Sequence, residues 1–333
     1  MRVLGSVAVF IILLSTLTAQ TNAQIMHIPA FDGDNAYDCI LNQCSFGPRP
    51  PGSENLTLCR LYISENLESF GWNVTLQNFT YRETICTNII ATWNSSINAS
   101  IVLGAHYDTR PEASQEPDLL NRTKPILGAN DGGSGTAILM ELARVLPESV
   151  RSEIEIVLFD AEDSGGINGW EWIRGSTYYV AELNSTRRES ISAMVLVDMV
   201  GDNDLNLPRE GSSTSSLQNA IWSIAGQMAH GDIFVDSVGG SIIDDHRPFL
   251  DAGIPAVDLI QYPFPEYWHT LQDTPDKCSA ESLEIVGSVL EVFIVEHVAG
   301  NGTYPPDVPY LVYAAIIIVP GFIILVVYLY RKQ

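Results

Sequence analysis

The chain has 333 residues, of which 46% are hydrophobic and 17% are charged, and its formal net charge at pH 7 is −23. This length and composition allow one large domain with a full hydrophobic core and additional terminal segments. The sequence contains no cluster of Lys and Arg. Nucleic-acid binding needs a basic surface, so nucleic acid is excluded as a partner.

The first 23 residues are typical of a secretory signal peptide. Arg2 precedes an apolar stretch over residues 3–17, and small or polar residues lead up to Ala23. This order predicts a cleaved signal peptide over residues 1–23, and a retained N-terminal anchor is the alternative. The folded domain is then expected over residues 24–298.

Helices and strands alternate through this domain. Apolar residues at helical spacing predict helices over residues 36–44, 54–70, 136–146, 172–183, 216–229 and 282–298. Short runs rich in β-formers predict strands over residues 74–79, 88–93, 101–108, 154–160, 191–200 and 256–261. This alternation predicts an α/β fold with helices on both faces of a sheet.

Two segments in the first half of the domain carry candidate metal ligands. His106 lies at the end of the predicted strand 101–108, where Asp108 can orient its ring. Asp131 lies among the glycines of residues 128–135, just before a predicted helix. Glycines let the backbone approach an ion, and a helix N-terminus tolerates negative charge. An ordinary helix cap at Asp131 is the alternative.

The predicted strand 154–160 ends in a group of acids. Asp160, Glu162 and Asp163 follow its apolar body and precede Gly165 and Gly166. In open α/β sheets, ligands bind where strands end and turn into loops. Because neighbouring acids point in different directions, one can bind a metal ion while another transfers a proton. A solvated acidic turn is the alternative.

The second half of the domain adds two candidates. Asp198 lies near the end of the predicted strand 191–200, and His269 follows a Pro-rich loop. A capping aspartate and a packed histidine are the alternatives. Together, four strand ends or the loops beyond them carry five carboxylates and two histidines. Imidazole and carboxylate ligands without Cys suit Zn²⁺, which polarises a carbonyl group or activates water.

The C-terminal segment is typical of a membrane anchor. Residues 308–330 are apolar and long enough to cross a bilayer as a helix, and Arg331 and Lys332 follow at once. The positive-inside rule places residues 331–333 in the cytoplasm. Residues 299–307 are then an extracellular stalk, and the protein is a single-pass cell-membrane protein with an extracellular catalytic domain. A buried core helix is the alternative.

The cysteines and the glycosylation sequons are interpreted for a domain that lies outside the cell. Outside the cell most of the five cysteines should be paired, and the odd number leaves one free or paired between chains. Their spacing is not that of a zinc-binding pattern. The density of N-x-S/T sequons predicts a glycosylated surface. The sequons begin at Asn55, Asn73, Asn78, Asn94, Asn98, Asn121, Asn184 and Asn301.

Five segments occur in the order G-A-H-Y-D-T-R, G-A-N-D-G-G-S-G-T-A, F-D-A-E-D-S-G, V-D-M-V-G-D and Y-W-H-T. They resemble motifs of the zinc aminopeptidase superfamily, which includes the glutaminyl-peptide cyclotransferases, and the match covers roughly residues 37–298. The resemblance implies a three-layer α/β/α domain with a central mixed, mostly parallel sheet.

The resemblance also implies roles for the candidate residues. Asp131, Asp163 and His269 would bind a first zinc ion, and Glu162 would be the general acid and base. In two-zinc aminopeptidases, the residues matching His106 and Asp198 bind a second zinc ion, which Asp131 bridges to the first. One zinc ion, or two, is therefore expected.

Residues 241–250 and 264–269 resemble the cyclotransferase branch more than the aminopeptidases. In that branch the residues matching Asp198 and Asp244 form an acid chain to the general acid and base, and a tryptophan matching Trp268 packs against the substrate. Asp163 departs from the Glu of animal cyclotransferases, and a helix cap is the alternative for Asp244.

The function that this resemblance implies is conversion of N-terminal Gln on peptides or proteins into pyroglutamate, with release of ammonia. A two-zinc aminopeptidase that releases N-terminal residues is the alternative. An inactive ectodomain that only binds ligands is a more remote one.

Overall fold

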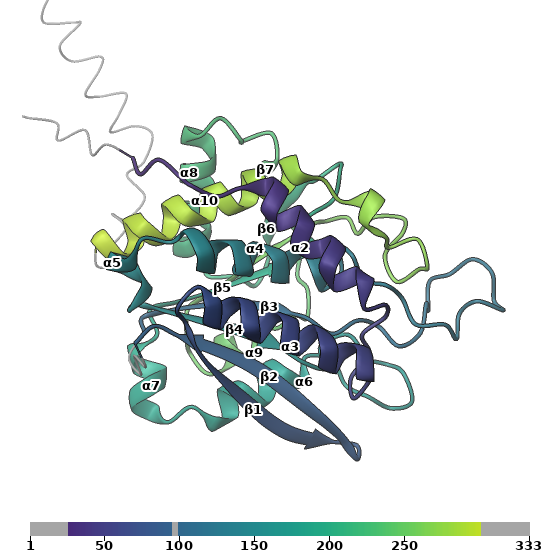
Figure 1. Cartoon of the computed structure of the whole chain (residues 1–333). Helices are drawn as coiled ribbons and strands as arrows, with labels where there is room; N and C mark the ends of the chain where they lie inside the picture. The colour runs from purple at the N-terminus through teal and green to yellow at the C-terminus, as the bar shows by residue number, and fades with distance from the viewer. Residues whose placement is uncertain (1–25, 95–98, 301–333) are drawn as a thin grey trace, which may run out of the picture.

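A six-stranded sheet forms the middle layer of the fold (Figure 1). The structure is a computed structural model that describes residues 26–94 and 99–300. Strand order is β1-β2-β4-β3-β5-β8. β2 pairs antiparallel with β1 and β4, whereas β3, β4, β5 and β8 are parallel. The strands span Asn73–Tyr81 (β1), Thr84–Thr92 (β2), Ile101–His106 (β3), Ile154–Phe159 (β4), Ala193–Asp198 (β5) and Ala256–Ile260 (β8).

Helices cover both faces of the sheet, so the predicted three-layer α/β/α fold with a mixed, mostly parallel sheet is confirmed. The larger layer contains α2 (Gly33–Ser45), α3 (Glu54–Ser69), α4 (Gly133–Val145), α8 (Ser215–Gln227) and α10 (Ala280–Ala299). The other layer contains α6 (Arg174–Glu182) and α9 (Arg247–Asp251). Two short helices are α5 (Glu148–Arg151) and α7 (Ser185–Ser190).

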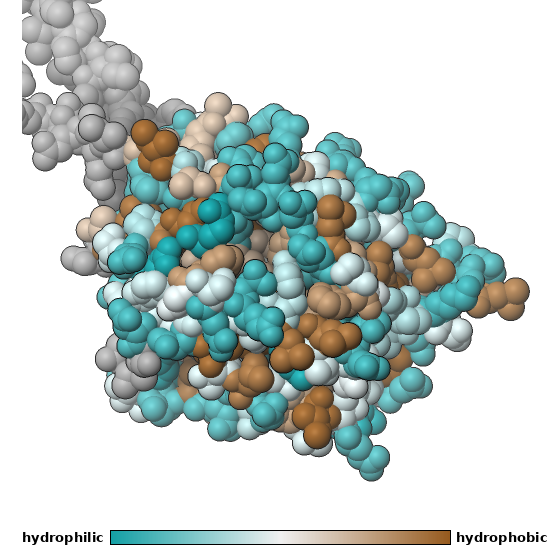
Figure 2. All heavy atoms as spheres, in the orientation of Figure 1, coloured by the Kyte–Doolittle hydropathy of each residue, from teal (hydrophilic) through white to brown (hydrophobic). Residues whose placement is uncertain are grey.

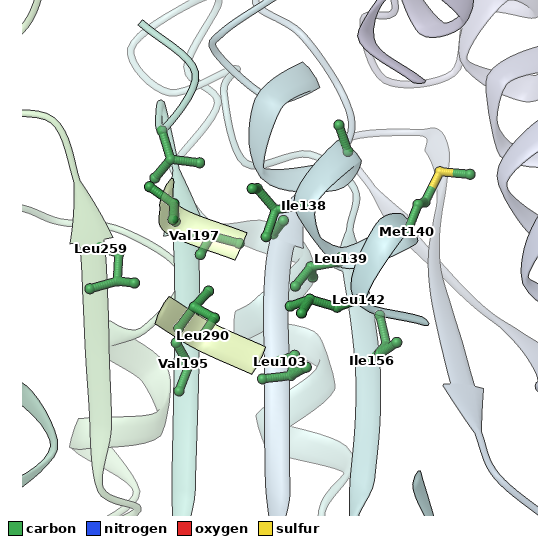
Figure 3. Packing of buried hydrophobic residues seen from close by; sticks show 14 of the residues in the cluster. Leu103, Ile138, Leu139, Met140, Leu142, Ile156, Val195, Val197, Leu259 and Leu290 are labelled. Atoms are coloured by element: carbon green, nitrogen blue, oxygen red, sulfur yellow. The ribbon is translucent and has the colours of Figure 1, made fainter. Parts of the chain in front are cut away.

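The central strands are hydrophobic throughout because both of their faces are covered. Every residue of β3, β4, β5 and β8 is buried. Alternate residues serve alternate layers: Leu103 packs with α4 and α10, whereas Val102 faces the smaller layer. Figure 3 shows Leu103 and Val195 pointing toward the helical side chains of the larger layer. The visible surface is mainly hydrophilic, with scattered apolar residues (Figure 2).

A second, two-stranded parallel sheet was not predicted from the sequence. It pairs β6 (Leu207–Glu210) with β7 (Phe234–Gly240) and contains register shifts after Pro208 and Arg209. Both strands are short, and most of β7 is exposed, so neither has a clear apolar pattern. This small sheet places Glu210 beneath the loop that carries Asp244.

The expectation that most cysteines are paired is wrong, because all five cysteines are free. Four of them lie in or against the main core cluster, and Cys86 lies in a smaller one. The Sγ of Cys39 contacts the Sδ of Met140 at 3.3 Å, and Cys86 packs in a small cluster with Phe79. Burial raises the pKa of the Cys39 thiol to about 12. These thiols act as small apolar core residues.

Several terminal predictions fall outside the described residues: the signal peptide over residues 1–23, the transmembrane segment over residues 308–330 and the tail over residues 331–333. Residues 299–307, the predicted stalk, begin at the last residue of α10. Among residues 26–94 and 99–300, no helix is both long and apolar enough to cross a membrane.

The contact between α4 and the sheet gives a test of the fold. A Cβ atom at Gly135 would lie 2.1 Å from the carbonyl oxygen of Val197 on β5, so Gly135→Ala forces α4 away from the sheet. We expect this change to lower the free energy of unfolding by at least about 2 kcal/mol, the scale of an overpacked core. Denaturant unfolding measures it.

Gly226→Ala is the matched control, because nothing lies within 4 Å of a Cβ atom at this helical position. Alanine forms helices better than glycine, so the free energy of unfolding of this variant should be unchanged or higher by up to about 1 kcal/mol. Equal stability of the two variants would contradict the close approach of α4 to β5.

Candidate active site

The candidate residues meet at the carboxyl ends of the parallel strands, where open α/β sheets bind ligands. His106 and Asp198 are the last residues of β3 and β5, and Glu162 and Asp163 lie just beyond β4. A pocket of about 240 Å³ opens there. Its lining consists of Asp131, Glu162, Asp163, Trp172, Asp198, Met199, Ile242, Ile243, Asp244, Ile260, Phe264, Trp268 and His269.

Two buried groups of ligand atoms share Asp131. In one, His269 Nε2 lies 3.1 Å from Asp163 Oδ1 and 3.5 Å from Asp131 Oδ2. In the other, His106 Nε2 lies 3.2 Å from both Asp131 Oδ1 and Asp198 Oδ1. Each group is able to hold a metal ion. The two carboxylate oxygens of Asp131 thus face two different histidines.

The spacing of these atoms fits zinc. Ligands of a tetrahedral zinc ion lie roughly 3.4 Å from one another, given zinc–ligand bonds of about 2.0–2.1 Å. The distances of 3.1–3.5 Å within the two groups agree with this value. Asp131 Oδ2 and Asp163 Oδ2 are buried and make no hydrogen bond with the described protein atoms. Their lone pairs are therefore available to a cation.

The protonation preferences of the site also favour a cation. Burial lowers the pKa of His269 to about 3, so its imidazole is neutral and can donate an electron pair. Burial raises the pKa of Asp131 to about 6 and that of Asp163 to about 7. Although burial opposes it, the carboxylate of Asp198 contributes most to raising the pKa of His106 above its usual value. Crowded carboxylates of this kind are stabilised by a bound metal ion.

Two aspartates fix the loops that carry the ligands. Asp108 Oδ1 accepts a hydrogen bond from Glu162 N at 3.1 Å, and Oδ2 accepts one from Asp163 N at 3.3 Å. Asp108 Oδ1 also lies 3.5 Å from His106 Nδ1, the contact expected from the sequence. Asp273, which was not predicted from the sequence, accepts hydrogen bonds from the backbone of Asn130 and Asp131.

Arg110 was also missed, although it lies in one of the recognised motifs. Its Nη1 donates to Asp163 Oδ1 at 3.1 Å, and its guanidinium stacks 4.8 Å from the ring centre of Trp172. The side chain is buried, so this charge lies inside the wall of the site. Arg110 therefore orients the shorter Asp163 carboxylate and braces the neighbouring indole.

Two further acids line the pocket beside the metal groups. Burial raises the pKa of Glu162 and of Asp244 well above their usual values, and nearby carboxylates raise both further. The alternative that Asp244 caps a helix is wrong. The N-cap of α9 is His246, and no side chain caps this helix.

Aromatic side chains form the wall next to His269. The ring centre of Trp268 lies 3.6 Å from that of His269 in a stacked arrangement, and Phe264 packs on Trp268 at 4.5 Å. Trp172 stacks parallel to the imidazole at 6.0 Å. Trp172 was predicted to lie in a helix, but α6 begins only at Arg174. The result is an apolar cavity with acids at one end.

Three residues with strained backbone conformations lie at the same place. Ala161, Met199 and His269 have φ angles of 61°, 46° and 56°, which non-glycine residues rarely adopt. Ala161 precedes Glu162, and Met199 follows Asp198. Such strain persists where surrounding contacts fix the backbone, and it is common at functional sites.

The fold, the ligand groups and the relatives together define a zinc-dependent enzyme of the cyclotransferase and metallo-aminopeptidase type. The chain belongs to peptidase family M28, whose sequence profile matches residues 88–294. Among curated proteins, it is 25% identical over 288 residues to the glutaminyl-peptide cyclotransferase of Bos taurus, covering 75% of this chain and 78% of that protein.

Solved structures of bacterial proteins are also similar. The Porphyromonas gingivalis glutaminyl cyclase has a TM-score of 0.76 and 32% identity, covering 80% of this chain and 99% of that one. The Bacteroides thetaiotaomicron glutaminyl cyclase bound to N-acetylhistamine has a TM-score of 0.73 and 33% identity at the same coverage. A Zn-dependent exopeptidase from Parabacteroides distasonis has a TM-score of 0.73 and 29% identity, again at this coverage.

Removing one imidazole tests the metal site. His269→Ala leaves two carboxylates in the group that contains Asp163, so we expect less bound zinc and loss of turnover. Metal analysis of the purified protein, together with activity, measures both effects. His230→Ala, in the turn after α8, is the control and should retain zinc. Full zinc occupancy in His269→Ala would show that this imidazole is not a ligand.

Proposed function

We propose that this protein is a glutaminyl-peptide cyclotransferase, which converts an N-terminal Gln into pyroglutamate and releases ammonia. The observation that carries this proposal is Asp244, a buried acid that lines the pocket together with Glu162 and Asp198. Hydrolysis of a peptide bond by two metal ions needs one base and has no evident task for this further acid. Cyclisation moves a proton between two nitrogens of the same substrate.

The chemistry requires one carbonyl activator and one proton carrier. Asp131, Asp163 and His269 would hold zinc, which as a Lewis acid polarises the γ-amide carbonyl of the substrate. Glu162 accepts the proton that the α-amine loses as it bonds to the amide carbon. Glu162 then delivers this proton to the departing nitrogen, which leaves as ammonia.

Asp198 and Asp244 keep Glu162 in a suitable state for this exchange. Closely spaced carboxyl groups do not all ionise easily, so a proton is retained among them. A Glu whose pKa is raised by burial can both accept and return a proton near neutral pH. The packed rings of Trp268 and Phe264 would form an apolar wall for the substrate side chain.

A two-zinc aminopeptidase is the second candidate, and one observation favours it. His106, Asp131 and Asp198 form a second complete ligand group next to the first. In that mechanism Glu162 deprotonates a water molecule, which attacks the first peptide bond. The complete ligand groups argue against an inactive ectodomain.

Asp244 separates the two candidates. Asp244→Asn keeps the shape of the side chain but removes its ionisable proton, so we expect normal folding, normal zinc content and a loss of Gln cyclisation of at least about 10²-fold. Ammonia release and pyroglutamate formation from a Gln-peptide measure it, with an aminoacyl-anilide assayed in parallel. Asp251→Asn, an exposed change on α9, is the control.

Either of two results would contradict the cyclotransferase proposal and favour the aminopeptidase function. One is a normal rate of Gln cyclisation by Asp244→Asn. The other is a wild-type protein that releases N-terminal residues and forms no pyroglutamate.

We also propose that the enzyme is secreted, glycosylated and anchored by residues 308–330, with its catalytic domain outside the cell. The apolar run followed by Arg331 and Lys332 supports this topology. α10 begins beside the loop after β5, where Ser279 N donates to Gly201 O. Its 20 residues then extend roughly 30 Å toward the C-terminus. This direction takes Gly300, the last described residue, away from the pocket end of the sheet.

Truncation tests this topology. A protein that ends at Gly300 retains all of α10, so it should be released into the medium in active form, whereas the full chain stays with membranes. An endoglycosidase should increase the gel mobility of both, because Asn73, Asn78 and Asn184 are exposed sequon positions. Loss of folding on truncation would indicate that the C-terminal segment belongs to the core.

A further inference from the structure

A second buried polar cluster lies behind Asp244. Glu210, His246 and Asp258 come from the end of β6, the N-cap of α9 and the middle of β8, and their exposed fractions are 3%, 0% and 0%. His246 Nε2 lies 3.4 Å from Glu210 Oε2, and Nδ1 lies 3.5 Å from Asp258 Oδ2. None of the three lines the pocket.

Glu210 is the fixed end of this cluster. Its carboxylate accepts hydrogen bonds from the backbone N–H groups of Ser212, Ser213 and Ile242, at 2.7–3.0 Å. Although burial opposes it, these bonds and the contact with His246 lower the pKa of Glu210 to about 2. Since Ile242 lines the pocket, Glu210 ties the pocket loop to the small sheet.

His246 joins this fixed carboxylate to Asp258. Its Nε2 lies 3.1 Å from Ser212 Oγ and close to Glu210, whereas its Nδ1 faces Asp258 and makes no hydrogen bond within the described residues. The same residue is the N-cap of α9 and lies two positions after Asp244. The orientation of the Asp244 loop is therefore linked to the contacts of His246.

Asp258 lies directly below the pocket. It precedes Ile260, a lining residue, by two positions on β8, so both side chains point to the same face of the sheet. Both Asp258 oxygens are buried and make no hydrogen bond within the described part of the chain. A carboxyl group in this environment destabilises the fold. Groups with this cost are concentrated at functional sites.

We propose that Glu210, His246 and Asp258 are positioning residues that hold Asp244 against Glu162 and act on the reaction only through Asp244. The inference rests on the proposed cyclotransferase function. It assigns a role to three side chains that do not touch the substrate, and it makes the small β6–β7 sheet part of the catalytic support.

Asp258→Asn is the first test, because it removes the ionisable proton with little change of shape. We expect kcat for Gln cyclisation to fall by at least about 10-fold, with KM and zinc content unchanged, as for loss of an interaction made in the transition state. The midpoint of thermal unfolding should stay equal or rise, since a buried carboxyl group is removed. A merely structural role would lower this midpoint and leave kcat unchanged.

A double-mutant cycle with Asp244→Asn tests whether Asp258 changes kcat only through Asp244. Residues that act through one shared group are not additive. In the Asp244→Asn background, Asp258→Asn should therefore change kcat by less than about 2-fold. His246→Gln should behave in the same way. Glu291→Gln is the matched control, a buried carboxylate on α10 that binds the N–H groups of Ala30 and Phe31. It should lower stability and leave kcat unchanged.

The outcomes separate this inference from the proposed function. If the wild type cyclises Gln-peptides but Asp258→Asn retains full kcat, the positioning role is overturned and the cyclotransferase function stands. Additive losses in the double mutant also overturn it. If the wild type forms no pyroglutamate, the proposed function fails before any variant is made, and the positioning role falls with it.

Discussion

The site depends on one shared carboxylate. Asp131 faces His106 with one oxygen and His269 with the other, at 3.2 Å and 3.5 Å. Both ligand groups therefore need the same backbone position just before α4. Asp273 fixes that position through the N–H groups of Asn130 and Asp131, and the close contact of Gly135 with β5 fixes the helix itself. A small shift of α4 would disturb both ligand groups together.

Several acids are buried in one wall of the pocket, and their negative charge must be balanced by nearby positive charge and hydrogen-bond donors. Arg110 neutralises part of the charge at Asp163, and Asp108 uses its oxygens to hold the backbone of the same loop. A zinc ion held by the two ligand groups would supply further positive charge. Glu162 and Asp244, beside the ligand groups, keep raised pKa values because they are buried among other carboxylates. The site thus separates electrophilic activation from proton transfer.

Family M28 includes enzymes of different chemistry, so family membership alone does not choose between cyclisation and hydrolysis. The ligand atoms around Asp131 suit either reaction. The choice depends instead on the acids beside Glu162 and on what holds them. Glu210, His246 and Asp258 lie outside the metal groups and behind Asp244, which is why we connect them with proton transfer rather than with metal binding.

The sequence by itself determined the α/β class, most strand and helix positions and the acids at the strand ends, because burial on both faces and helical periodicity are local patterns. It also identified the motif residues that the structure brings together around Asp131. Only the tertiary structure decided which residues support them. Asp273 and Arg110 contact ligands that are distant in the chain, and Glu210 meets His246 through a small sheet without a clear sequence pattern. The five cysteines are free for the same reason, since pairing depends on which buried surfaces meet.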